Sequence, residues 1–257
     1  MKRRLFGICV AAISLAAQPA LSAGMLDYRF GFNAYFGGFK VGEGNGELHW
    51  GDGRYAMDFK AQSAGALELL MKVDQTAFSN GRLDAKPQVE RHRNQNFDGK
   101  KNNWIELAFT PETVDIVDAK PDPKTEKTRS PIPADMLRGV VDPMTAVLSL
   151  GLTATATDRC DATLPVFDGR RRYDAVFSQV GSEKYKGPAG VRDTLKCKFD
   201  FVRRAGYKKK DKRWKGLTGT VWLQTLGEGL PMLPVRVQVE TSYGTALVHM
   251  VSARPMK

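Results

Sequence analysis

Residues 52–61 read Asp-Gly-Arg-Tyr-Ala-Met-Asp-Phe-Lys-Ala, and this stretch has the period of a β-strand. After the turn signal Asp52-Gly53, apolar side chains recur at every second position, at Tyr55, Met57 and Phe59. When apolar residues repeat every two positions, their side chains all lie on one face of a strand. The stretch therefore predicts a half-buried strand that follows a tight turn.

Most of the remaining sequence repeats this pattern in short runs separated by Gly, Pro, Asn and Asp. Asn80-Gly81 and Asp98-Gly99 are turn signals typical of β-hairpins. In the C-terminal half, strands are predicted over 162–167, 171–180, 193–203, 217–226, 234–241 and 245–251. The pattern predicts an all-β, mainly antiparallel fold of about a dozen strands.

One short helix is predicted within this β-rich pattern. Asp142 is a favourable N-cap, and Pro143 suits the first helical position. We expect the helix to end at Gly151. Because so short a helix is stable only when packed, we expect it to cover an open end or seam of the barrel. Residues 66–71 fit either a second helix or a buried strand.

The chain has 257 residues, a net charge of +11 and 42% hydrophobic residues. This composition excludes a disordered chain, a collagen and a disulfide-dense mini-scaffold. A β-barrel of this length commonly forms one domain, so residues 24–257 are predicted to form a single broken or curved β-barrel. The proline-rich stretch 120–133 is expected to be an exposed connection within it. A linker between two domains is the alternative.

Residues 1–23 have the pattern of a secretory signal peptide. Basic residues 2–4 precede the apolar run 5–17, and small residues follow up to Ala23. No later run is long and apolar enough for a membrane-spanning helix. We therefore expect an exported protein. A lipid anchor is not expected, because Ile8 precedes Cys9 where a lipoprotein signal needs a small residue.

Two of the three cysteines, Cys160 and Cys197, lie outside the predicted signal peptide. A pair of cysteines in an oxidising compartment favours a structural disulfide over a metal site or a catalytic thiol. Strand periodicity allows both sulfur atoms to face inward. Closing this loop stabilises a fold by up to about 4 kcal/mol in the chain-entropy model.

The segment Phe167-Asp168-Gly169-Arg170 predicts a β-hairpin with a two-residue turn. In that register Val166 faces Arg171, and Tyr173 shares the same mostly apolar face. A guanidinium on such a face must be paired or hydrogen-bonded. Arg171 and Tyr173 are therefore candidates for a ligand contact or for an internal ion pair.

Residues 203–215 hold eight Lys or Arg residues against one Asp, which is +7 of the net charge of +11. In an exported protein such a loop attracts anionic lipid head groups, lipopolysaccharide or acidic cell-wall polymers, and nucleic acid is not an expected partner. A solvated loop between strands is the alternative. The candidate residues for contact with an anionic surface are Arg203, Arg204, Lys208, Lys209, Lys210, Lys212, Arg213, Trp214 and Lys215.

The sequence contains no H-E-x-x-H, no G-x-S-x-G, no phosphate loop and no dinucleotide-binding glycine motif before a helix. The glycine-rich run 42–46 is expected to permit a bend or bulge in a strand. His49, His92 and His249 lack the spacing of metal ligands and are assigned structural positions on strands. We predict no catalytic residue, no metal and no cofactor.

Four segments occur together in a consistent order. They are Gly-Phe-Lys-Val-Gly-Glu at 38–43, Asp142-Pro143 before a short apolar run, Cys160 followed by Leu-Pro-Val-Phe-Asp-Gly-Arg-Arg-Arg-Tyr at 164–173, and Leu-Pro-Val-Arg at 233–236. This pattern resembles an exported family of Gram-negative bacteria, the domain-of-unknown-function 3108 family. The resemblance covers nearly the whole mature chain. The family has no activity to transfer, so no catalytic residues are assigned from it.

That family is similar in style to periplasmic broken-barrel proteins, which include lipoprotein carriers and envelope-integrity factors. Such proteins wrap a curved antiparallel sheet around an apolar interior. We therefore expect a periplasmic, non-enzymatic binding or carrier protein of the cell envelope, with a lipid or amphipathic ligand whose anionic group contacts Arg171. The alternatives are an envelope-integrity protein that acts through protein contacts and, third, a cell-wall or lipid hydrolase. The expected partners are a lipid or amphipathic ligand, an anionic membrane surface or an envelope protein.

Overall fold

The computed structural model describes residues 25–65, 68, 72–123, 128–208, 218–241 and 243–256. These residues form an antiparallel sheet of 13 strands, which confirms the predicted all-β class. The strands are β1 Leu26–Phe36, β2 Phe39–Gly51, β3 Arg54–Ser63, β4 Asp74–Leu83, β5 Pro87–Phe97, β6 Asn102–Phe109, β7 Val114–Lys120, β8 Ala162–Phe167, β9 Arg172–Gly187, β10 Gly190–Ala205, β11 Thr218–Gln224, β12 Leu233–Thr241 and β13 Gly244–Pro255. The helices are the 3-10 helix η2 Ala134–Leu137 and the α-helix α2 Pro143–Thr157.

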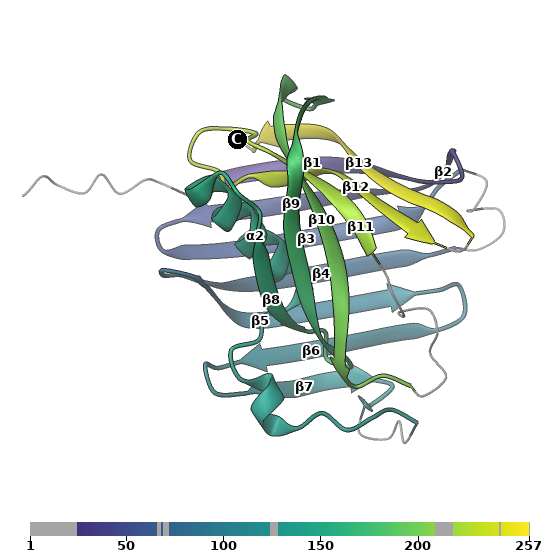
Figure 1. Cartoon of the computed structure of the whole chain (residues 1–257). Helices are drawn as coiled ribbons and strands as arrows, with labels where there is room; N and C mark the ends of the chain where they lie inside the picture. Colours follow the sequence, from purple (N-terminus) through teal and green to yellow (C-terminus); the bar gives the residue numbers. More distant parts are fainter. Residues whose placement is uncertain are drawn as a thin grey trace, which may run out of the picture.

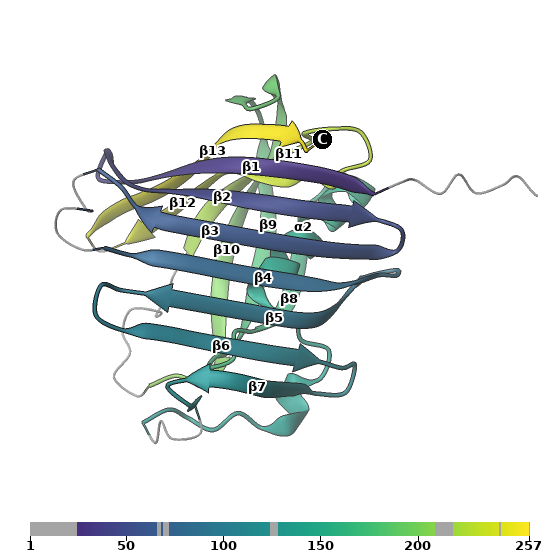
Figure 2. The same ribbon diagram turned by 180° about the vertical axis from the view of Figure 1, so that it is seen from behind.

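The sheet consists of two meanders that meet where β1 pairs with β13. Strands β1 to β7 form one meander, and strands β8 to β13 form the other. Figures 1 and 2 show that β3 to β6 form one side of the molecule and that β8, β9 and β10 cross them on the opposite side. Strands β7 and β8 are the two ends of the strand order and do not pair with each other. The barrel is therefore broken, as the sequence predicts.

Helix α2 packs on the concave face of this curled sheet, against β4, β5, β8 and β12. Its buried Leu150 and Ala154 belong to an apolar cluster with β10 and β11 residues. The predicted end at Gly151 is wrong, because the helix continues to Thr157. Gly151 is required for a close approach: a Cβ there would lie 2.0 Å from the carbonyl oxygen of Met232. Asp158, with a left-handed φ of 53°, ends the helix instead.

We call the gap between the unpaired strands β7 and β8 the seam. Apolar side chains and the backbone at Val141 cover it. Val141 forms a parallel bridge with Val166, and its carbonyl oxygen accepts a hydrogen bond from the backbone N–H of Phe167 at 2.9 Å. Phe167 and Val140 pack with Leu107 in an apolar cluster that spans the gap between the two meanders. The edge of β8 is thereby protected from pairing with another chain.

Two predicted turns differ in the structure. Val166 pairs with Tyr173 and not with Arg171, so the β8–β9 hairpin has a wider turn than the predicted two residues. The side chain of Asp168 explains this, because it accepts hydrogen bonds from backbone N–H groups within the turn. The predicted turn at Asn80-Gly81 is also wrong, since Gly81 lies inside β4. A Cβ on Gly81 would lie 2.0 Å from the carbonyl oxygen of Gln88, and the register shifts at this point.

The sulfur atoms of Cys160 and Cys197 lie at disulfide distance, 1.92 Å apart, and both residues are fully buried. This pair joins the chain just after α2 to the central part of β10. Most described residues of the connection 120–133 are exposed. The predicted signal peptide lies outside the described residues, as does the segment 66–71 except for residue 68. Within the described part of the chain, no helix has the length and apolar character needed to cross a bilayer.

Candidate ligand-binding site

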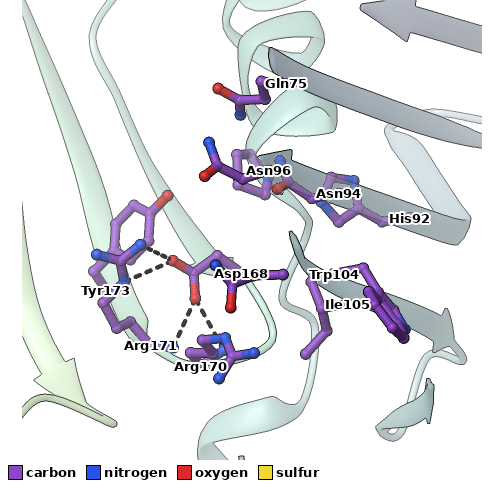
Figure 3. A pocket seen from close by; sticks show the side chains of 12 residues that line it. Gln75, His92, Asn94, Asn96, Trp104, Ile105, Asp168, Arg170, Arg171 and Tyr173 are labelled. Atoms are coloured by element: carbon purple, nitrogen blue, oxygen red, sulfur yellow. Dashed lines mark hydrogen bonds and ion pairs between the residues drawn. The ribbon is translucent and has the colours of Figure 1, made fainter. Parts of the chain in front are cut away.

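A pocket of about 380 Å³ opens beside the seam, on the side of the molecule where the two meanders do not pair. One wall is the concave face of β4, β5 and β6, and the opposite wall is the β8–β9 turn with the start of β9 (Figure 3). Ile105 contributes to the sheet wall, and Pro143 brings the first residue of α2 to the pocket. The pocket thus lies where three parts of the chain that are distant in sequence meet.

Amide side chains form the sheet wall of the pocket. Asn96 on β5 is the direct cross-strand partner of Gln75 on β4 and of Asn103 on β6. Asn94, two residues from Asn96, lies on the same face. These four residues are half-buried. The hydrogen bonds found among the described residues include none from their side chains. We call them the amide row.

Amides are unusual on the concave face of a sheet, where apolar side chains normally pack. Each one carries two N–H donors and a carbonyl acceptor. Figure 3 shows Gln75, Asn94 and Asn96 opposite Tyr173 and Arg171. The amide row therefore offers several uncharged hydrogen-bonding groups to whatever occupies the pocket.

The charged residues of the opposite wall are paired within the chain. The Nε and Nη2 atoms of Arg171 lie 2.7 and 2.6 Å from Oδ2 of Asp168. The other carboxylate oxygen of Asp168 accepts the backbone N–H groups of Arg170 and Arg171 at 2.9 and 2.7 Å. Arg170 donates to the carbonyl oxygen of Pro121 at 2.8 Å. Of the two sequence-based alternatives for Arg171, the structure thus shows the internal ion pair, within the turn.

Tyr173 is buried beside this ion pair and lines the pocket. Its ring meets that of Phe201 edge-on, with centroids 5.2 Å apart. Burial, followed by the negative charge of Asp168, raises the pKa of the Tyr173 hydroxyl above its usual value. The phenol is therefore a neutral hydrogen-bonding group at physiological pH.

Next to the amide row on the concave face, a second polar cluster is buried. His92 and Asp142 have side-chain exposures of 2% and 0%. Oδ1 of Asp142 lies 3.1 Å from Nδ1 of His92 and accepts from the Ser79 hydroxyl at 2.7 Å. Oδ2 of Asp142 accepts from Thr145, whose hydroxyl also lies 2.9 Å from that of Tyr55. We call these five residues the buried network.

Asp142 also caps helix α2, because its Oδ1 accepts the backbone N–H groups of Met144 and Thr145. Burial by itself would raise the pKa of Asp142. The hydrogen bond from His92 and its charge outweigh burial, together with the Thr145 and Ser79 hydroxyls, and hold the pKa below its usual value. The carboxylate therefore stays ionised and fastens the helix to β4 and β5.

Ser79, His92 and Asp142 are the residue types of a hydrolytic triad, but their geometry differs. Ser79 and Asp142 both contact Nδ1 of His92, at 2.8 and 3.1 Å. A triad needs the serine on one ring nitrogen and the carboxylate on the other, so that a proton can cross the imidazole. The buried network therefore has the geometry of a structural cluster.

Part of the predicted basic loop belongs to a strand. Arg203 and Arg204 lie on β10 and not in a loop. The guanidinium of Arg204 lies 2.6 Å from Asp174, and that of Arg203 lies 4.1 Å from the centre of the Tyr207 ring. Lys208 forms an isolated β-bridge with residue 129. The remaining candidates lie outside the described residues, namely Lys209, Lys210, Lys212, Arg213, Trp214 and Lys215.

The other two histidines lie on separate strands. Nδ1 of His49 is 2.7 Å from Asp27, and Nδ1 of His249 is 2.7 Å from the Tyr185 hydroxyl. Across the described ranges, no three His, Cys, Asp or Glu residues are grouped so that they could hold a metal ion.

Comparison with known proteins places the chain in a family. The profile of the DUF3108 family, proteins of unknown function, matches residues 31–251. This chain belongs to the DUF3108 family. No curated protein sequence matches it. The family match therefore agrees with the resemblance seen in the sequence and transfers no activity.

One solved structure supports the same kind of fold. A β-barrel-like protein of the DUF1849 family from Brucella abortus is 9% identical, covers 90% of this chain and 98% of its own, and has a TM-score of 0.56. A candidate lipoprotein from Parabacteroides distasonis is 10% identical, with coverages of 89% and 95% and a TM-score of 0.35. A candidate exported protein with a YmcC-like fold from Bacteroides fragilis is 12% identical, with coverages of 88% and 95% and a TM-score of 0.34. The Brucella protein supports the DUF3108 chain's broken-barrel fold and nothing further.

Proposed function

We propose that this DUF3108 protein is an exported, non-enzymatic binding protein of the cell envelope that takes a hydroxyl-rich, uncharged group in the seam pocket. The amide row carries the proposal. These four amides are half-buried, line the pocket and make no hydrogen bond within the described chain, so their donors and acceptors are open to a ligand. A sugar-like group presents adjacent hydroxyls that both donate and accept, as the amides do.

The state of the charged groups favours an uncharged ligand over an anionic one. Arg171 already holds Asp168 through two nitrogen atoms, and Arg170 is bonded to Pro121. An anion in the pocket would have to break these contacts or share them. We therefore replace the expected role of Arg171, contact with an anionic group, by a role in shaping the pocket wall.

A binding role agrees better with the pocket than hydrolysis does. Glycosidases use two carboxyl groups that flank the scissile bond. Of the described residues that line the pocket, Asp168 alone carries a carboxylate, and its oxygens are occupied by the turn and by Arg171. His92 contributes its ring to the lining, but its Nδ1 belongs to the buried network. Export is proposed from the N-terminal pattern of basic, apolar and small residues.

The test is titration calorimetry with maltose as the probe. We expect wild-type protein to bind maltose, and the double variant Asn96→Ala/Asn103→Ala to bind it roughly thirtyfold more weakly, because at least two hydrogen bonds of about 1 kcal/mol each are lost. Gln95→Ala is the matched control: Gln95 neighbours Asn96 on β5 but bonds to Asn102 in an exposed pair. Equal maltose affinity in the double variant and the wild type would contradict the proposal, as would no binding by the wild type.

A further inference from the structure

The concave face changes from polar to apolar along a single cross-strand row. Starting from the amide row, Gln75 on β4 pairs with Ala61 on β3. Ala61 pairs with Gly44 on β2, and Gly44 pairs with Phe32 on β1. Direct cross-strand neighbours lie side by side on the same face. The amides are therefore continuous with an apolar surface, and no charged residue separates them along this row.

That apolar surface is incompletely buried. We define the apolar strip as Phe32, Phe59, Phe177, Phe201, Val237 and Val239. All of them are only half-buried, although the last four pack beside the cluster that contains Leu150 of α2. Neighbouring Val248, the β13 partner of Val237, is 36% exposed. Half-exposed aromatic and branched side chains that gather on one concave face mark a binding surface.

Glycines deepen the strip on β2. A Cβ on Gly44 would lie 3.4 Å from Cζ of Phe59, and one on Gly46 would lie 3.4 Å from Cε2 of Phe32. The two phenylalanine rings, with centroids 6.0 Å apart, therefore lie close over the glycine backbone. Gly44 is also approached by the backbone of β3, since a Cβ there would lie 2.7 Å from the carbonyl oxygen of Lys60. Side chains at these two positions would lie against the rings, so the glycines leave that side of both rings uncovered.

The opposite wall of the pocket leads to the same strip. Tyr173, which lines the pocket, packs edge-on against Phe201, with ring centroids 5.2 Å apart. The ring centroids of Phe201 and Phe199 are 5.4 Å apart, and those of Phe199 and Phe177 are 6.1 Å apart. On both walls, therefore, hydrogen-bonding groups at the seam give way to apolar side chains further along the concave face.

We propose that the pocket and the apolar strip bind one amphiphile, an alkyl or acyl glycoside, with its sugar on the amide row and its chain along the strip. This proposal rests on the proposed function, because the sugar occupies the same pocket. The occupant follows from the chemistry of the two surfaces. The head group is uncharged since the cations of the pocket are paired, and the tail is a hydrocarbon since the strip offers no polar partner.

The experiment measures how affinity depends on chain length. Maltose and hexyl, octyl and decyl maltoside are titrated into the intact protein by calorimetry, below the concentration at which they form micelles. We expect affinity to rise by roughly threefold to fourfold for each methylene that reaches the strip. The double variant Asn96→Ala/Asn103→Ala is expected to weaken every ligand by the same factor, because it removes contacts to the sugar only.

Variants of the apolar strip distinguish the contribution of the hydrocarbon tail to affinity from that of the sugar head group. Phe59→Gln places an amide on the strip and is expected to reduce the gain per methylene while maltose affinity stays unchanged. Asp58→Asn is the matched control, since Asp58 is exposed on the other face of β3. Val239→Thr, which keeps the shape and strand preference of the side chain, repeats the test with less risk to folding. Circular dichroism verifies that each variant is folded.

The possible results distinguish the two proposals. If maltose binds through the amide row but longer chains add nothing, the strip is not a tail site and this inference is overturned, while the proposed function stands. The same holds if another part of the chain covers the strip. If laurate binds as tightly as a maltoside and is unaffected by Asn96→Ala/Asn103→Ala, the strip is a separate lipid site and the inference is again overturned. If neither maltose nor any maltoside binds, both proposals fail.

Discussion

The buried network and the amide row lie next to each other on the concave face, and both consist of polar side chains. In the buried network, Asp142 has hydrogen-bonding partners for both carboxylate oxygens, and these partners come from three separate elements. In the amide row, four amides face a pocket and do not bond to the described chain. Residue type does not distinguish the two clusters. The difference is whether folding itself satisfies the hydrogen-bonding groups: the first cluster is satisfied within the protein, and the second is the surface that we propose binds a ligand.

The largest effect is expected from removal of Asp142. Asp142→Ala leaves the buried His92, Ser79 and Thr145 side chains without their shared acceptor. It also removes the cap of helix α2. We expect the free energy of unfolding to fall by about 3–5 kcal/mol, measured by urea denaturation. A loss of unfolding free energy below about 1 kcal/mol would show that the buried network does not hold the fold together, and the contrast with the amide row would fail.

The next largest effect concerns the cysteine pair, which fastens the end of helix α2 opposite to the buried network. Cys160→Ala/Cys197→Ala opens a loop with a sequence separation of 37 residues. We expect a loss of up to about 4 kcal/mol in the free energy of unfolding. Equal stability of the wild type with and without reductant would refute a disulfide at this place. The reduced wild type is the control, because it separates bond loss from side-chain loss.

Acid is expected to weaken the buried network selectively. The pKa of Asp142 is lowered in the folded state, so its contribution to stability is present above its unfolded pKa, about 3.9, and is lost as the pH falls through the folded value. Wild-type protein should therefore lose more stability than Asp142→Asn when the pH drops from neutral towards the acid range, because the amide does not titrate. Urea midpoints for both proteins over this range give the measurement. Parallel losses in the two proteins would contradict this assignment.

The smallest effect on stability is expected in the amide row. Asn96→Thr keeps strand preference and removes an amide that has no partner in the described chain. We expect the free energy of unfolding to change by less than about 0.5 kcal/mol, while maltose binding weakens. Thermal denaturation and calorimetry on the same sample measure both effects. A stability loss comparable to that of Asp142→Ala would mean that the amides are structural, and the contrast between the two clusters would disappear.

Much of the fold could be predicted from local patterns. Alternation at Tyr55, Met57 and Phe59 depends only on the period of a strand, and β3 has that period in the structure. Asp142 and Pro143 begin helix α2 as predicted, because capping is a local interaction. The local pattern wrongly predicts a helix end at Gly151 and a turn at Gly81. Each is a glycine because another strand or loop approaches its backbone closely, and such contacts have no signal in the neighbouring sequence.

The candidate site was less predictable. Arg171 could be placed near a turn, but its partner Asp168 depended on the width of that turn. The amide row has a weak local signal, since the strand 87–97 carries Asn94 and Asn96 where alternation predicts apolar residues. That Asn96 aligns with Gln75 and Asn103 depends on the register of β4, β5 and β6.

By itself, the sequence determined which segments become strands, where helix α2 begins and which two cysteines can pair, because these properties depend on side-chain period, local hydrogen bonds and composition. Only the tertiary structure decided that Asp142 meets His92 and Ser79 in a buried network, and that the amide row meets the apolar strip. Those contacts join residues from different strands, and they depend on how the sheet curls over α2. Curvature and cross-strand register arise from the packing of the whole sheet.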